Sequence, residues 1–254
     1  MNALFQRRWP QAVRDAFRRP MLMALLSLVV CHVHVSSDDG VHASRIRASL
    51  SLAETKVREA GDSARAIDHV QLGDAQLRFG RVEESIHSFE RAIEMRPEWK
   101  PELWQYGIAL AFAQRYREGR ELFEMHRRVN PHDVENAAWH FLCVAKDADL
   151  ATARQLLLPA PSDPRPPMKQ VLRRLAGGDD AIVVDAVRDT RSMRQRDSAQ
   201  FFADLYLGLI ADAEGNSAKA EQYMQAAAKT GLGHYMADVA RVYAKRLTLG
   251  RAKK

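Results

Sequence analysis

The middle of the chain repeats itself every 34 residues. A glycine, a phenylalanine and a proline each recur at this spacing: Gly73 and Gly107, Phe89 and Phe123, Pro97 and Pro131. Because three different residue types coincide at one spacing, we infer two copies of one structural unit. A pair of packed helices needs these three residues: glycine where the helices touch, phenylalanine toward the next unit, and proline where the second helix ends.

This period and residue pattern are those of the tetratricopeptide repeat (TPR), an antiparallel pair of helices. We assign repeat one to 66–99 and repeat two to 100–133. A third repeat begins near Val134, and its second helix is cut short by Pro159 and Pro161. Such repeats bury a continuous core only by stacking on their neighbours. The sequence therefore predicts a stack of helical hairpins.

Helical patterns also flank the repeats, and a returning repeat follows from the pair Leu207-Gly208 together with Ala220 and Ala227. The predicted fold class is all-α: an α-solenoid of TPR helical hairpins with a degenerate helical middle. We divide the chain into six segments: 1–43, an export signal; 44–65, an N-terminal capping helix; 66–164, TPR repeats one to three; 165–200, the degenerate middle with short helices over 166–176 and 179–189; 201–247, a C-terminal TPR and a capping helix from about 233; and 248–254, a basic tail.

The N-terminus has the order of a secretory signal. Five arginines precede an uncharged apolar run from Met21 to Val30, and a polar stretch follows it. Val41 and Ala43 are small residues at the positions that a signal peptidase reads, so we predict cleavage after Ala43 and an exported, periplasmic or envelope-associated protein. The run is shorter than the roughly 20 residues that a membrane span needs.

Two alternatives to cleavage after Ala43 stay open. Cys31 follows Val30, with Leu28 at the position where lipoprotein signals carry leucine, so lipidation of Cys31 would anchor the chain to a membrane. A valine before the cysteine departs from that pattern. In the other alternative the first 43 residues are not a signal, and the chain is a cytoplasmic TPR scaffold.

The arrangement resembles the NlpI-type TPR lipoproteins of bacterial envelopes over about residues 50–245. The likeness is local to two stretches: Asn130-Pro-His-Asp133 followed by Trp139-His-Phe-Leu142, and Tyr206-Leu-Gly208 through Gly231. The resemblance implies an envelope adaptor that docks proteases or cell-wall enzymes on its helical surface, and it implies a homodimer. It transfers no individual binding residue.

Patterns for catalysis and cofactor binding are missing from the sequence. It contains no His-Glu-x-x-His run, no Gly-x-Ser-x-Gly elbow and no phosphate loop, so we expect no enzyme, no cofactor and no metal site. The net charge of +6 comes without a nucleic-acid-binding motif or a basic surface interleaved with aromatics, so we expect no nucleic acid partner. Cys143 lies in an apolar run and reads as a buried thiol. An enzyme or metal-binding protein on a helical-repeat frame remains the third functional alternative.

A TPR array binds ligands mostly along its concave face, which the first helix of each repeat lines. The repeat register places these residues on that face: Val70, Asp74, Leu77, Trp104, Ile108, Phe112, Ala138 and Trp139. The five positions that would clamp a C-terminal carboxylate carry no basic residue, so we exclude that kind of ligand: Val70, Asp74, Gln105, Glu135 and Trp139. An apolar groove with aromatic walls fits an amphipathic helix or an extended apolar peptide. Alternatively, the protein's own middle helices cover Trp104 and Trp139.

From the repeat pattern and the signal-like N-terminus together, the predicted function is a non-enzymatic adaptor that binds proteins outside the cytoplasm.

Overall fold

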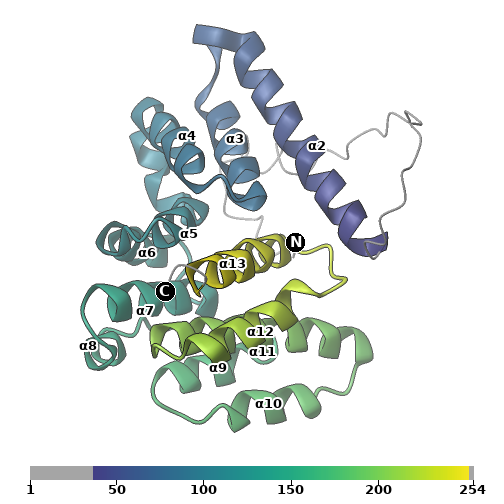
Figure 1. Ribbon diagram of the computed structural model, residues 1–254. Helices are drawn as coiled ribbons and strands as arrows, with labels where there is room; N and C mark the ends of the chain where they lie inside the picture. Colours follow the sequence, from purple (N-terminus) through teal and green to yellow (C-terminus); the bar gives the residue numbers. More distant parts are fainter. Residues whose placement is uncertain (1–36, 252–254) are drawn as a thin grey trace.

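The computed structural model describes residues 37–251, and within this range it holds helices and no strand. The elements in chain order are α2 (Ser37–Ala60), η2 (Gly61–Ser63), α3 (Ala66–Phe79), α4 (Val82–Met95), η3 (Pro97–Glu102), α5 (Trp104–Phe112), α6 (Tyr116–Val129), α7 (Val134–Asp147), α8 (Leu150–Gln155), α9 (Met168–Leu175), α10 (Ala181–Arg188), α11 (Met193–Ala213), α12 (Ser217–Ala228) and α13 (Tyr235–Arg251). The predicted all-α helical solenoid is confirmed (Figure 1).

The repeating residues do what their positions predict. A Cβ atom on Gly107 would lie 2.7 Å from the Phe123 ring, and one on Gly73 would lie 3.1 Å from the Phe89 ring, so each glycine lets its two helices approach closely. The Phe89 ring in turn meets Tyr106 of the next repeat at 6.0 Å. Hairpins α3–α4 and α5–α6 therefore share one core.

Helix ends follow the same period. Helix α4 ends at Met95 before Pro97, and α6 ends at Val129 before Pro131. The turn inside each hairpin needs a left-handed residue, at φ 91° for Gly80 and φ 62° for Gln114. The two positions are also 34 residues apart, and glycine adopts this conformation without the strain that glutamine bears.

The flanking helices begin and end near the predicted positions, with two differences. Helix α2 starts at Ser37 rather than within the predicted segment 44–65, so the bond after Ala43 lies inside a helix. The predicted signal up to residue 36, with Cys31, lies outside the described residues. Among the residues from 37 to 251, no helix has the length and apolarity needed to cross a membrane.

Helix α13 is the second difference. We expected it to cap the end of the solenoid, but it lies in the middle of the molecule, packed on α12 and reaching back to α3 (Figure 1). The reason is the curvature of the chain: the helices after α8 turn back, α11 packs on α7, and α12 then carries α13 over the concave face of the first repeats. The solenoid closes on itself instead of staying open.

Candidate functional site

The candidate site is the concave face formed by α3, α5 and α7, the first helices of the three predicted repeats. The structure brings all the predicted groove residues together on it, and each is buried except Trp104, which is half-buried: Val70, Asp74, Leu77, Trp104, Ile108, Phe112, Ala138 and Trp139. The face is therefore not an open groove in this structure. The sequence left two alternatives open, an open groove and a face covered by the protein's own helices. The structure has the second, with Tyr235 and Tyr243 of α13 lying against Trp104 and Trp139, where the middle helices had been suggested.

Two tyrosines of α13 meet the aromatic residues of the concave face. Tyr235 packs its ring edge-on against Trp104, with ring centroids 5.0 Å apart. Tyr243 sits between Phe112 at 5.2 Å and Trp139 at 5.8 Å. Edge-on and offset pairs of this kind are each worth about 0.5–1.5 kcal/mol beyond the area they bury. The tyrosines stand eight residues apart, which places them on one side of the helix.

A cation–π contact holds Tyr235 in place, and a hydrogen bond holds Tyr243. The guanidinium of Arg78 lies over the Tyr235 ring, 5.5 Å from its centroid. The Tyr243 hydroxyl donates a hydrogen bond of 2.6 Å to Asp212 of α11. Burial, together with the negative charge of Asp212, raises the pKa of Tyr243 well above its usual value. Burial likewise raises the pKa of Tyr235, so both tyrosines stay neutral and act as aromatic surfaces with a polar tip.

A buried acid, Asp238, ties α13 to the N-terminal helices. Arg45 of α2 donates to it at 2.8 Å, Arg241 lies 3.2 Å away, and Arg78 of α3 lies 3.6 Å away. Arg78 also pairs with Asp74 at 2.9 Å. Burial alone would lower the pKa of Arg78, but the negative charges of Asp74 and Asp238 outweigh it and raise that pKa. Since each buried charge has an opposite neighbour, this junction can exclude water.

A second polar cluster lies at the start of α7, below the loop that joins α8 to α9. Arg165 in that loop contacts three carboxylates: Asp163 at 2.6 Å, Asp133 at 3.0 Å, and Glu135. The Tyr206 hydroxyl of α11 donates to Glu135. Burial raises the pKa of Asp133 to about 7, and the nearby Glu135 charge adds to the effect. One guanidinium serves three acids, so the cluster favours keeping a proton on one of them near neutral pH.

Sequence reasoning missed the α13 residues Tyr235, Asp238, Tyr243 and Arg246. Arg246 donates to the backbone carbonyl of Phe112, so it too faces the repeats. A signal was available, because spacings of three, five and three residues place these four side chains on one side of a helix. The pattern indicates a helix with a patterned contact face, but it does not say which surface that face contacts.

The enzyme and metal-site alternative was compared with the side chains that the structure describes. Across residues 37–251, no group of three or more His, Cys, Asp or Glu side chains is arranged to hold a metal ion. Burial raises the pKa of the Cys143 thiol, which makes it a poor nucleophile. Burial lowers the pKa of His126, whose Nδ1–H donates to the Pro101 carbonyl at 2.8 Å. These side chains serve packing.

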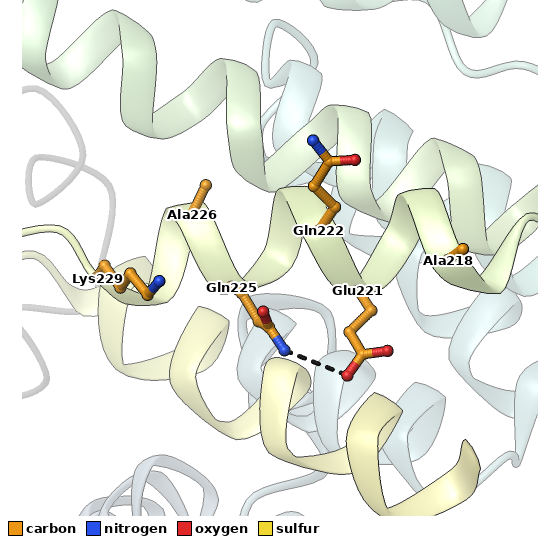
Figure 2. Close-up of a pocket in the computed structure, with 6 residues that line it drawn as sticks. All are labelled: Ala218, Glu221, Gln222, Gln225, Ala226 and Lys229. Carbon is orange, nitrogen blue, oxygen red and sulfur yellow. Dashed lines mark hydrogen bonds between the residues drawn. The ribbon is translucent and has the colours of Figure 1, made fainter.

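The outer side of α12 carries a shallow hollow of about 560 Å³ (Figure 2). Five residues of this helix and the residue that follows it line the hollow: Ala218, Glu221, Gln222, Gln225, Ala226 and Lys229. The figure shows Gln222 and Ala226 on one side of the helix and Glu221 and Gln225 on the other, with a hydrogen bond of 3.2 Å from Gln225 to Glu221. A hollow over one helix offers few converging groups, so we do not assign it a ligand.

Comparison with protein-family models identifies one repeat in the chain. Residues 69–98 match the family model described as "Tetratricopeptide repeat". The match covers most of α3 and all of α4, which is our repeat one. A search of curated proteins found no match to the chain. One stretch of the chain thus matches a tetratricopeptide repeat, and TPR repeats generally mediate contacts between proteins and are typically non-catalytic.

Proposed function

We propose that this chain is a non-enzymatic adaptor that holds protein partners outside the cytoplasm. The observation that carries the proposal is the repeat frame itself: stacked hairpins with a concave face that already binds a helix through aromatic and ionic contacts. A surface built this way recognises protein segments rather than small substrates.

Export is the second part of the proposal, and it rests on the order of the first 43 residues. A mature chain that begins at Ser44 keeps Arg45, which contacts Asp238, and Ile46, which is buried. The predicted cleavage is thus compatible with the packing of α2. Since the bond after Ala43 is helical in the folded chain, cleavage would precede folding of this helix.

The NlpI-type resemblance suggests the class of partner: envelope proteases or cell-wall enzymes. It also suggests homodimerisation. Lipidation of Cys31 would add membrane association through the N-terminal segment. These finer assignments are proposals, supported by the motif likeness around Asn130 and Tyr206.

The test has two parts, applied to the protein from its native cell. Mass and N-terminal sequence distinguish the three alternatives for processing and localisation. The first residue of the purified chain is Ser44 after cleavage, a modified Cys31 after lipidation, and Met1 in a cytoplasmic scaffold. For partners, a photo-crosslinking residue is placed singly at one exposed position on each of four helices: Glu83, Glu121, Val184 and Gln222.

An adaptor gives a discrete crosslinked species from the positions that lie on its binding surface, at least one of the four. The remaining positions give only background. The chain without the crosslinking residue is the control. If every position gives only background, the chain holds no stable partner and the adaptor proposal fails. An intact Met1 in the cytosol removes the export part and leaves a cytoplasmic TPR scaffold.

A further inference from the structure

We propose that the concave face is a receptor for an amphipathic helix, that α13 is its resident occupant, and that a partner helix of the same chemistry exchanges with α13. The inference deepens the proposed function and rests on it, because it names where an adaptor would take its partner. The partner is defined by its contact pattern: aromatic, acidic, aromatic and basic side chains in the order of Tyr235, Asp238, Tyr243 and Arg246.

The first step is the match between the helix and the face. Each of the four side chains of α13 meets a group at a TPR concave position or beside one. Tyr235 meets Trp104, and Asp238 meets Arg78. Tyr243 meets Phe112 and Trp139, and Arg246 meets the Phe112 carbonyl. The contacts run along all three repeats, as those of a helix bound in a groove do.

The second step is that α13 is attached by a link and not by a continuous helix. Residues 230–234 between α12 and α13 form no helix, and a Cβ atom on Gly233 would have open space around it. Helix α12 packs on α11 as well as on α13, and α3 packs on α2 and α4 as well as on α13. The link can therefore move α13 while the repeats keep their own partners.

The third step is that a polar atom of the concave face makes no hydrogen bond to α13. The Trp139 indole N–H, against which Tyr243 stacks, is buried with no acceptor among the described residues. Such groups are rare in protein interiors because each one costs free energy. A partner helix with an acceptor for the Trp139 N–H would gain a hydrogen bond that α13 does not make.

The test uses a fluorescent 19-residue peptide, 233–251, and the full-length chain. The chain is studied as wild type and as Tyr243→Ala, which weakens the resident helix and leaves the concave face unchanged. The apparent Kd of a peptide for a site that is open only part of the time equals its intrinsic Kd divided by the open fraction, so it falls as α13 is weakened and that fraction rises. We expect the Tyr243→Ala chain to bind the peptide at least 10-fold more tightly than wild type does.

Two controls separate exchange from general loosening. A peptide that itself carries Tyr243→Ala should bind the Tyr243→Ala chain at least 10-fold more weakly than the native peptide. A chain with Phe89→Ala is destabilised in repeat one, away from α13, and should bind the native peptide no better than wild type.

Equal peptide binding by the wild-type and Tyr243→Ala chains, or none by either, would overturn the proposal and make α13 a fixed part of the core. If circular dichroism shows the Tyr243→Ala chain unfolded, the milder Tyr243→Phe, which loses only the bond to Asp212, takes its place. Tyr243→Phe must then bind the peptide more tightly than wild type, or the proposal fails. The photo-crosslinking result is independent, since an adaptor can hold partners on another surface.

Discussion

Arg45 of α2 and Asp238 of α13 form an ion pair of 2.8 Å across 193 residues of sequence. The arginine is 44% exposed and the aspartate 1% exposed, so the pair reaches from the surface into the interior. It joins the first described helix to the last one. The closure of the solenoid therefore depends on charge as well as on the aromatic contacts of α13.

Replacing Asp238 by asparagine should destabilise the chain by about 3 kcal/mol, because arginines around a buried acid lose its compensating charge. Arg78, which is mostly buried, should suffer most. Urea unfolding followed by circular dichroism measures the change. Asp185→Asn is the control, since it breaks an exposed pair with Arg188 and should cost less than about 0.5 kcal/mol. Equal effects of the two substitutions would contradict the role assigned to Asp238.

The stability of the folded chain should fall when its first residue is moved from Ser44 to Ala48. A chain beginning at Ser44 keeps Arg45 and the buried Ile46, and its unfolding free energy should lie within about 0.5 kcal/mol of the full chain. A chain beginning at Ala48 loses both side chains and should be less stable by about 2–4 kcal/mol, mostly from the lost apolar burial and the unpaired acid. Thermal unfolding of the two chains checks this. Equal melting temperatures would show that the N-terminal end of α2 does not hold α13.

Gln114→Gly should stabilise the protein by about 0.5–1 kcal/mol. Gln114 has φ 62°, a left-handed conformation that costs a non-glycine residue about 1 kcal/mol or more. Gly80 fills the equivalent turn of repeat one at φ 91°, so Gly80→Ala should destabilise the chain instead. Chemical denaturation of both variants provides the comparison, and a loss of stability in Gln114→Gly would mean that its side chain contributes more than the strain costs.

The repeat frame could be predicted from sequence because its determinants are local and periodic. Gly107 and Phe123 meet within one hairpin, and Pro131 ends a helix by its own geometry. The left-handed turn at Gln114 was also within reach, because it lies seven residues after Gly107, as Gly80 does after Gly73.

The occupant of the concave face could not be predicted in the same way. The pattern of Trp104, Phe112 and Trp139 shows that this face is apolar, but an apolar face says nothing about which segment covers it. Which segment covers the face depends on how far the helices after α8 curve back. That curvature is the sum of many packing angles between helices. Asp238 and Arg45 meet only because of that sum.

The polar cluster around Arg165 should make stability depend on pH in an unusual direction. An aspartate side chain has an ordinary pKa of 3.8, which applies to Asp133 in the unfolded chain. Burial raises the pKa of Asp133 to about 7 in the folded chain. The folded state thus binds this proton more tightly than the unfolded state does. The cost of ionising Asp133 is absent below about pH 4, grows as the pH rises, and is fully present above about pH 7.

Asp133→Asn removes this cost and keeps the cap of α7, since an asparagine oxygen can still accept the hydrogen bond of 3.1 Å from the Glu135 N–H. The variant should therefore gain stability relative to wild type as the pH rises from 5 to 8. Asp149→Asn is a matched control at the start of α8: hydrogen bonds from Thr152 lower the pKa of Asp149, so this carboxyl stays ionised from pH 5 to 8. Its effect on stability should be constant over that range. Urea unfolding of both variants at pH 5, 6, 7 and 8 tests this, and a pH-independent effect of Asp133→Asn would show that the three carboxylates around Arg165 share no proton.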